Sequence, residues 1–231
     1  MIEHGSSPGP ASLVPFGDEA VLITFPGEAT VESAARAQAL ARSIRVAVGD
    51  EPGWGAAVPA AMSVVVHVDP VTPGVAAALP ILARLAATLG PDDDRWPETG
   101  PASDIAVRYG GDDGPDLDTV AGLTGLSPAQ VIEAHASATY RVLFLGFAPG
   151  FGYLGPLPSE LVVPRRATPR VRVPGGSVAI AGPYTAVYPG DGPGGWHILG
   201  RSSAAIWDPR REPPALLEPG ALVRFVPEAS G

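Results

Sequence analysis

Arginine side chains gather in one stretch of an otherwise acidic chain. Between residues 138 and 207 there are six arginines and only two acids, Glu160 and Asp191, although the 231-residue chain carries a formal net charge of −9. Guanidinium groups bind carboxylates and phosphates through paired hydrogen bonds, so this stretch predicts a site for a carboxylate, a phosphate or an acidic partner surface. The alternative is that these arginines guard solvated strand edges. Spacing alone leaves both interpretations open.

Four histidines are the candidate proton carriers, and none stands at a metal-ligand spacing from another. His4 falls in the N-terminal tail, and His67 falls in an apolar strand where a surface position is the simpler interpretation. His135 precedes a β-prone run and could line a pocket, while His197 lies in a Gly-Gly-Trp corner. Either of the last two could act as an acid or base only if a third group orients its ring.

Ser177 follows a Pro-Gly-Gly corner and precedes a predicted strand. Its hydroxyl could donate to an oxyanion, although a turn-capping serine is the simpler interpretation. The chain has no GxSxG or SxxK element, which argues against an activated serine nucleophile. The corner at residues 192–195 has the composition of a phosphate-binding loop but lacks the lysine and the following helix.

Two reactive residue types are absent, since the chain contains neither lysine nor cysteine. Without lysine, a P-loop and Schiff-base chemistry are excluded. Without cysteine, disulfides, thiolate nucleophiles and cysteine zinc sites are excluded. The acidic net charge argues against general nucleic-acid binding. The N-terminus lacks a signal-peptide pattern and no apolar run approaches the ~20 residues of a membrane helix, so we expect a cytoplasmic protein that does not contact membranes.

The N-terminal half alternates strands and helices. Helical periodicity appears at residues 30–48, with Thr30 as the N-cap, and at residues 74–89. β-prone runs occupy residues 13–25, 62–68 and 104–109. The first of them is either two β segments around a Gly-Asp turn or one strand with a bulge at residues 17–18. The order strand, helix, strand, strand, helix, strand is ferredoxin-like. The acidic loop at residues 90–101 is the best linker, and the boundary could fall on either side of the strand that follows it.

The C-terminal half consists of short β-prone runs between Pro-Gly corners, which is typical of a tightly cornered β-barrel or sandwich. These runs occupy residues 142–147, 171–173, 177–181, 185–188 and 196–199. Two short helices, at residues 117–123 and 127–137, precede these runs, and aromatic residues flank the corners. We therefore predict an α+β protein with a disordered tail at residues 1–11 and domains at residues 12–100 and 101–231. The residues alone suggest an arginine-lined, aromatic-rimmed hollow without a self-sufficient catalytic set, which a second chain would complete.

Three segments of the C-terminal half carry a resemblance to a known family. They are GFAPGFGYL (146–154), PRRATPRVRVPGGSVAIAG (164–182) and PGGWHILGR (193–201). The sequence resembles the KipI / PxpB family, also called allophanate hydrolase subunit 1, and the resemblance covers nearly the whole chain in order. It implies a ferredoxin-like N-terminal domain and a cyclophilin-like β-barrel.

The resemblance also implies a function that depends on other chains. Family members act with a subunit 2 (KipA / PxpC) chain and a third LamB / YcsF-type subunit as an ATP-dependent 5-oxoprolinase. ATP, with Mg, would then bind at the level of the complex, since no recognisable motif for it is present here. The alternatives are an allophanate hydrolase subunit and a regulatory module that inhibits a sensor histidine kinase.

The resemblance carries over candidate residues for a small anionic substrate. Three arginines would hold carboxylate or phosphate oxygens: Arg165, Arg170 and Arg201. Ser177 and the amides of Gly175 and Gly176 would steady an oxyanion, and His135 or His197 would move protons. Apolar walls would come from Phe147, Tyr153, Tyr188 and Trp196. The arginine clamp predicts that Arg170→Ala abolishes activity of the complex while the heteromer stays intact.

The sequence departs from the family pattern at Ala61, Gly175 and His197, where the family often has tyrosine, alanine and glutamine. These positions touch a strand rim and the corner of the expected pocket.

Overall fold

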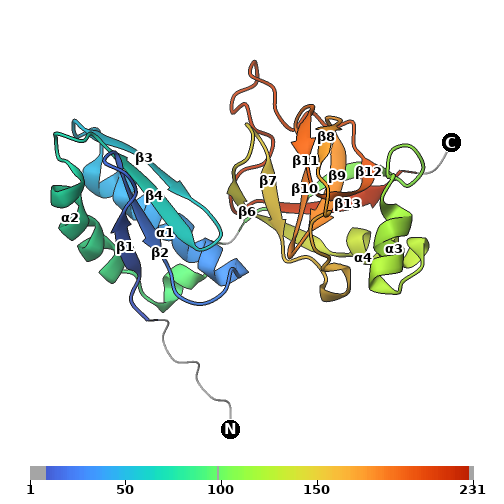
Figure 1. Ribbon diagram of the computed structural model, residues 1–231, viewed down its shortest axis with the longest axis horizontal. Coiled ribbons are helices and arrows are strands. Elements are labelled where there is room, and N and C mark those ends of the chain that lie inside the picture. Colours follow the sequence, from blue (N-terminus) through green and yellow to red (C-terminus); the bar gives the residue numbers. More distant parts are fainter. Residues whose placement is uncertain (1–8, 98, 229–231) are drawn as a thin grey trace, which may run out of the picture. The chain divides into compact units, whose positions relative to one another are not determined.

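The computed structural model describes residues 9–97 and 99–228. The chain forms two compact units, Met1–Pro97 and Glu98–Gly231, which divide inside the predicted acidic loop. Figure 1 shows the helices and strands of each unit. Residues 1–8 of the predicted tail lie outside the described residues, while Ala11 packs partly buried against the core of the first unit.

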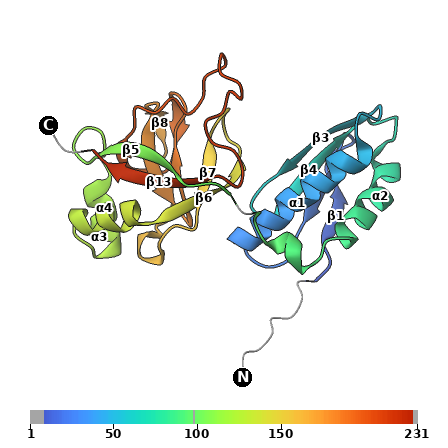
Figure 2. The ribbon, with the colours of Figure 1, turned by 180° about the vertical axis from the view of Figure 1, so that it is seen from behind.

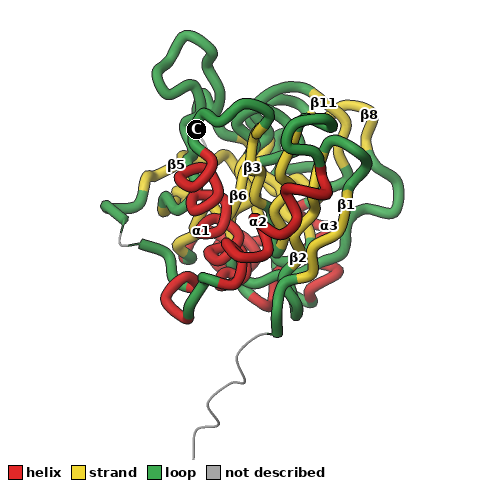
Figure 3. Tube along the Cα trace, turned by 90° about the vertical axis from the view of Figure 1, so that its left-hand side faces the viewer, coloured by secondary structure: helices red, strands yellow, loops and turns green. Residues whose placement is uncertain are grey.

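The first unit is a four-stranded antiparallel sheet with two helices on one face. The strand order is β1 (Ser12–Pro15), β2 (Ala20–Thr24), β4 (Ser63–Val68) and β3 (Trp54–Pro59). Helices α1 (Val31–Val48) and α2 (Val75–Ala87) pack side by side against it, as the red tubes of Figure 3 show. Alternating residues such as Val21, Ile23, Val64 and Val66 point into this core because strand side chains alternate between faces. A 3₁₀ turn, η1 (Pro91–Asp94), follows the second helix.

The sequence prediction for this unit is partly corrected. Thr30 is the N-cap of α1 as predicted, and its hydroxyl accepts a hydrogen bond from the Ser33 amide. The run at residues 13–25 is a hairpin of two strands, which confirms the first of its two predicted forms. The closing strand of the predicted ferredoxin-like order is not in this sheet, because β1 occupies the edge beside β2. That order is therefore not confirmed as predicted.

The second unit is a closed β-barrel of seven strands, which confirms the barrel prediction. The closed order is β10-β7-β6-β13-β5-β12-β9. The strands are β5 (Ser103–Tyr109), β6 (Thr139–Leu145), β7 (Gly152–Gly155), β9 (Ser177–Ala181), β10 (Tyr184–Val187), β12 (His197–Arg201) and β13 (Leu222–Pro227). Only the pair β13–β5 is parallel among the barrel pairings of the described chain. Fully buried side chains fill the interior, including Tyr140, Ile180 and Leu199.

Smaller elements surround the barrel. Helices α3 (Leu117–Thr124) and α4 (Pro128–Ser137) lie together at one end of it, as Figure 2 shows. Ser127 caps α4 and Pro128 opens it, which confirms the predicted start. A 3₁₀ turn, η2 (Ser159–Leu161), and a two-stranded ribbon of β8 (Arg170–Val173) and β11 (Gly192–Gly194) complete the unit.

The helices of the two units are too short or too polar for a membrane span. In the part of the chain that the structure describes, no helix combines the length and apolar character needed to cross a bilayer.

Candidate functional site

An aromatic pocket of about 140 Å³ lies in the second unit and is the candidate functional site. Five of the predicted substrate-binding residues line it: Phe147, Tyr153, Arg165, Tyr188 and Trp196. Phe151, Gly194 and Gly195 complete the lining. These residues come from β7 and its preceding loop, from the loop before β8, from the end of β10 and from the corner between β11 and β12. The barrel thus brings together corners that are far apart in the sequence.

Edge-to-face contacts hold the walls of the aromatic pocket. The Phe151 ring centroid lies 5.2 Å from that of Tyr188 and 5.5 Å from that of Trp196, and the interplanar angles exceed 80°. Such pairs contribute beyond the area they bury. At Gly194 an added Cβ would lie 2.4 Å from the Tyr188 hydroxyl oxygen. Position 194 therefore requires glycine, because any side chain there would collide with the Tyr188 phenol in the pocket wall.

Arg165 supplies the positive charge of the aromatic pocket. Its side chain is exposed, and no ion pair in the described part of the chain involves it. Burial raises the pKa of the Tyr153 phenol, and the Arg165 guanidinium opposes this only in part. Tyr153 therefore stays neutral at physiological pH. The pocket offers an anion one guanidinium group beside neutral phenols and apolar ring faces.

Arg170 does not face this pocket with a free guanidinium group. Its two terminal nitrogens donate to the carboxylate oxygens of buried Asp116 at 2.7 and 2.8 Å. Arg166 donates to the same carboxylate at 2.6 Å, and so does the Ile198 amide at 2.8 Å. The predicted clamp of Arg170 on a substrate is corrected here, because its bidentate partner belongs to the chain itself.

The electrostatics of Asp116 follow from this set of donors. Burial acts to raise its pKa, but the Arg170 and Ile198 hydrogen bonds, together with the two guanidinium charges, lower it below the ordinary range. Asp116 is therefore ionised throughout the physiological range. Sequence reasoning missed it because an aspartate before a helix normally caps that helix. Here Asp116 occupies the N-cap position of α3, yet its side chain makes no capping hydrogen bond.

The predicted oxyanion donors are occupied within the chain. The Gly175 amide donates to Asp191 Oδ1 at 2.8 Å, and the Gly176 amide donates to the Tyr188 carbonyl at 2.7 Å. Ser177 is buried and does not line the aromatic pocket. Arg201 lies 3.8 Å from an Asp113 carboxylate oxygen, also outside the pocket lining. The structure does not bring these four residues to the candidate site.

His135 is enclosed by the barrel and does not reach the aromatic pocket. Its ring nitrogens lie 2.7 Å from the Tyr109 hydroxyl and 2.8 Å from the Thr185 hydroxyl. The ring stacks on Phe225 with centroids 4.7 Å apart. Because it has no exposure, burial lowers the pKa of His135 to about 3. It is thus a neutral histidine of the core at physiological pH.

His197 lies directly after the pocket residue Trp196 but points its polar atoms into the protein. Its Nε2 lies 3.1 Å from the Pro164 carbonyl, and its buried Nδ1 has no hydrogen-bond partner among the described residues. Burial lowers the pKa of His197. The neutral ring therefore donates from Nε2 and links the 164–170 segment to β12.

A second, larger cavity of about 500 Å³ adjoins the first through Phe147. Trp207 and the two loops at residues 147–149 and 189–193 line it. Phe147 is the one non-glycine residue with positive φ in the described ranges, at 67°. The Ala148 amide donates to the Gly146 carbonyl at 2.8 Å across it, which is the strained γ-turn arrangement. Strain at a ligand-sized cavity is typical of functional positions.

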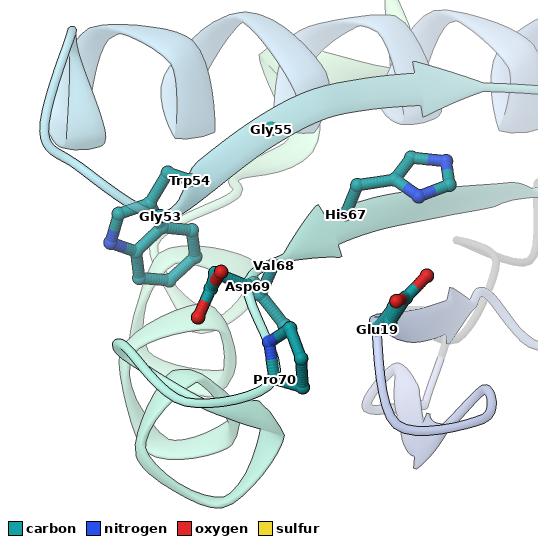
Figure 4. A pocket seen from close by; sticks show the side chains of 8 residues that line it. All are labelled: Glu19, Gly53, Trp54, Gly55, His67, Val68, Asp69 and Pro70. Atoms are coloured by element: carbon teal, nitrogen blue, oxygen red, sulfur yellow. The ribbon is translucent and has the colours of Figure 1, made fainter.

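The first unit also has a cavity, of about 350 Å³, shown in Figure 4. His67 approaches it from β4 and Glu19 from the bend before β2, and Trp54 and Asp69 lie at its other side. Asp69 is already engaged, since the amides of residues 71 and 72 donate to its carboxylate at 2.8 Å and lower its pKa. None of the predicted substrate-binding residues lies here. We therefore place the candidate site in the second unit.

Comparison with known families decides the identity of the fold. Residues 11–217 match the family described as carboxyltransferase domain, subdomain C and D. This chain belongs to that family.

Relatives of this carboxyltransferase-domain protein confirm the resemblance to the KipI / PxpB family. It is 56% identical to the B subunit of 5-oxoprolinase from Escherichia coli O157:H7 over 128 residues, 55% of this chain and 59% of that protein. It is 47% identical to the B subunit of 5-oxoprolinase from Bacillus subtilis over 123 residues, 53% of this chain and 51% of that protein. The matches thus span little more than half the length of these curated relatives.

Solved structures extend the likeness of this family member to nearly the whole chain. A conserved uncharacterized protein from Pyrococcus horikoshii is 38% identical, with a TM-score of 0.54, covering 94% of this chain and 97% of that one. The urea amidolyase of K. lactis gives a TM-score of 0.81 at 19% identity, covering 98% of this chain and 15% of that one. The second likeness concerns the fold alone.

Proposed function

We propose that this chain is a subunit of an ATP-dependent 5-oxoprolinase, in which it binds the lactam substrate in the aromatic pocket. The reaction would open 5-oxoproline to glutamate and couple this to hydrolysis of ATP to ADP and phosphate. The observation that carries the proposal is an aromatic cavity with one guanidinium group, Arg165, that no carboxylate of the described chain neutralises. The names of the curated relatives support the same reaction.

The chemistry of the pocket suits a small ring with one carboxylate. Arg165 would accept the carboxylate through charge-assisted hydrogen bonds. Tyr153, Tyr188 and Trp196 would enclose the ring, exclude water and orient the amide. The volume of about 140 Å³ lies below the usual range for drug-sized ligands, so a small metabolite is the fitting class.

The residues of this chain do not fit an ATP site. Phosphate loops rely on a lysine and a helix N-terminus, but the chain has no lysine, and residues 192–194 form strand β11 paired with β8. Within the described ranges, no three His, Asp or Glu side chains converge as a metal site. ATP and Mg would therefore bind to partner subunits.

The partners would be a subunit 2 (KipA / PxpC-type) chain and a LamB / YcsF-type third subunit, acting in the cytoplasm. Arg165 is exposed, and the described residues offer the pocket no acid or base of their own. A second chain covering this rim would supply the missing acid or base.

The ferredoxin-like assignment of the first unit and the cyclophilin-like assignment of the second also remain proposals. The order β1-β2-β4-β3 supports the first if β1 replaces the closing strand.

Reconstitution tests the function. The chain, purified with its two partners, should form glutamate from 5-oxoproline only when ATP and Mg are present. Omission of this chain should abolish turnover. Parallel reactions with allophanate test the closest alternative substrate. Inhibition of a sensor histidine kinase by this chain alone, without lactam hydrolysis by the complex, would overturn the proposal.

Binding to the single chain tests the pocket separately. Trp196 lies in the wall, so 5-oxoproline should change the tryptophan fluorescence of the isolated chain. The change should disappear in Trp196→Phe. Proline methyl ester, which lacks both the free carboxylate and the lactam, is the control ligand and should leave the fluorescence unchanged.

A further inference from the structure

Asp116 is a buried acid that the proposed chemistry does not use. Its relative exposure is 2%, and it stands at the start of α3, remote in sequence from the pocket residues. Its backbone is fixed to β12, because its amide donates to the Ile198 carbonyl at 3.0 Å. The carboxylate points away from the helix it precedes and accepts from Arg166, Arg170 and Ile198. Asp116 therefore links the start of α3 to two other chain segments, the one with Arg166 and Arg170 and the one with Ile198.

The segments that Asp116 joins are two neighbouring parts of the aromatic pocket. One segment, residues 165–170, begins with the pocket arginine and ends with Arg170. The other contributes Gly194, Gly195 and Trp196, and it continues directly into Ile198. The two also meet through the backbone, since the Arg166 amide donates to the Gly195 carbonyl at 2.8 Å. A single carboxylate thus holds both parts in register.

The connection to Arg165 is short. Arg166 is fixed at both ends, by its amide on Gly195 and by its guanidinium on Asp116. Because the amide and the guanidinium group of Arg166 are both held, the Cα of Arg165, one residue earlier, has little freedom to move. The exposed side chain of Arg165 therefore starts from a set position at the pocket rim. Removing the Asp116 charge would free Arg166 and Arg170 from the barrel and release that position.

We propose that Asp116 is a positioning residue, which acts through Arg166 and Arg170 to place the Arg165 guanidinium group against the carboxylate of the substrate. This inference rests on the proposed function of the aromatic pocket. It assigns to Asp116 no contact with the substrate and no proton transfer. Its effect is on recognition of the anion, so it appears in KM rather than in kcat.

The experiment is a double-mutant cycle in the reconstituted complex, with Asp116→Asn, Arg165→Ala and the double variant. Asp116→Asn should raise the KM for 5-oxoproline by ~10-fold, in line with a weakened charged hydrogen bond, and leave kcat within ~3-fold. Residues that act as a unit are non-additive. Adding Asp116→Asn to Arg165→Ala should therefore change kcat/KM by less than ~2-fold.

A matched control separates the charge of Asp116 from its place on the helix. Asp118 lies in the first turn of the same helix, but its side chain is exposed. Asp118→Asn should leave KM unchanged. If Asp116→Asn impairs folding in a thermal melt, Arg170→Gln loosens the same segment from its more exposed side. It should raise KM in the same direction, again without further loss in the Arg165→Ala background.

The outcomes distinguish this inference from the function on which it rests. Losses that multiply in the double variant, or a fall in kcat with KM unchanged, would show that Asp116 does not act through Arg165. The pocket assignment would then survive without the positioning role. If Arg165→Ala itself leaves KM for 5-oxoproline unchanged, the anion site is wrong and the inference falls with it.

Discussion

Two adjacent arginines, Arg165 and Arg166, differ in whether an acidic side chain of the described chain pairs with them. Arg165 is exposed at the rim of the aromatic pocket, with no ion pair in the described chain, whereas Arg166 is held by buried Asp116 at 2.6 Å. Other polar candidates are also held within the chain. Arg170 is bidentate to Asp116, and the His135 ring lies between two hydroxyl groups in the barrel. The pocket keeps Arg165 for a ligand, whereas these enclosed groups are paired inside the protein.

The comparison shows why residue type and local charge are insufficient to define a site. The arginine-rich stretch has a positive formal balance, but Asp116, 50 positions before Arg166, removes part of it. A guanidinium group that is bidentate to a buried carboxylate has its charge balanced inside the protein, and it offers a ligand only its remaining N–H donors. The useful charge of the pocket is therefore that of Arg165.

Arg165→Ala gives the largest expected effect on the pocket side of the comparison. Loss of one charged hydrogen bond should raise the KM of the complex for 5-oxoproline by ~10- to 100-fold. The melting temperature should be unchanged, because the side chain is exposed. Steady-state kinetics with glutamate detection give the measurement.

Arg172→Ala is the matched control for charge. Arg172 lies in nearby β8, and its side chain, 76% exposed, pairs with Asp191 outside the aromatic pocket. Equal losses in the two variants would mean that general positive charge, rather than the pocket arginine, recruits the substrate.

The next largest effect is expected from His135, which the barrel encloses, and it concerns the pH dependence of stability. Its pKa is lowered by burial to about 3, while in the unfolded chain it is near the ordinary 6.5. The unfolded chain therefore binds the extra proton first, and stability is lost as pH falls from about 6.5 towards 3. The slope from this group approaches ~1.4 kcal/mol per pH unit inside that window. Chemical denaturation at pH 7.0, 6.0 and 5.0 measures it.

His135→Gln should flatten that dependence even if it lowers the stability at pH 7. An amide can still bond to the hydroxyls of Tyr109 and Thr185 but does not titrate. His67→Gln, on an exposed position of β4, is the control and should keep the slope. An unchanged slope in His135→Gln would show that other groups, such as His197, carry the acid sensitivity.

Local signals in the sequence predicted the fold where neighbouring residues decide it. The Ser127-Pro128 pair marks the start of α4, and the run at residues 177–181 coincides with β9. The parallel pairing of β5 with β13, more than a hundred residues apart, leaves no local signal. The same reason explains why the sequence left open to which unit the strand at residues 104–109 belongs.

The candidate site was predictable to the same extent. The aromatic residues beside Pro-Gly corners do line a common cavity, because corners of a closed barrel gather at its ends, and their role as walls of a substrate site stays a prediction. The partner of Arg170 was not predictable, since Asp116 lies 54 positions earlier and has the local pattern of a helix cap. Burial of His135 and Ser177 likewise depends on strands that close around them only in the barrel.

The backbone of Phe147, a residue that lines the pocket, allows a further test of this comparison. At φ 67° a residue with a Cβ is strained, and glycine is not. Phe147→Gly and Phe147→Ala both remove the ring, so they differ only in this strain. The glycine variant should be more stable by ~1 kcal/mol, as measured by urea unfolding. A more stable alanine variant would mean that the γ-turn at this position is not strained.

Ser177→Ala should have the smallest effect, and it tests the enclosed side most directly. Removing a donor to a developing oxyanion typically costs ~10²- to 10³-fold in kcat. Ser177 is buried outside the pocket lining, and its backbone carbonyl accepts from the Tyr188 amide at 2.9 Å, a contact that alanine retains. We therefore expect kcat/KM within ~2-fold of the unmodified complex, a range small beside that oxyanion cost. Ser202→Ala, a second buried serine, controls for the loss of a hydroxyl. A hundredfold loss confined to Ser177→Ala would return Ser177 to the catalytic set and break the division between pocket and barrel.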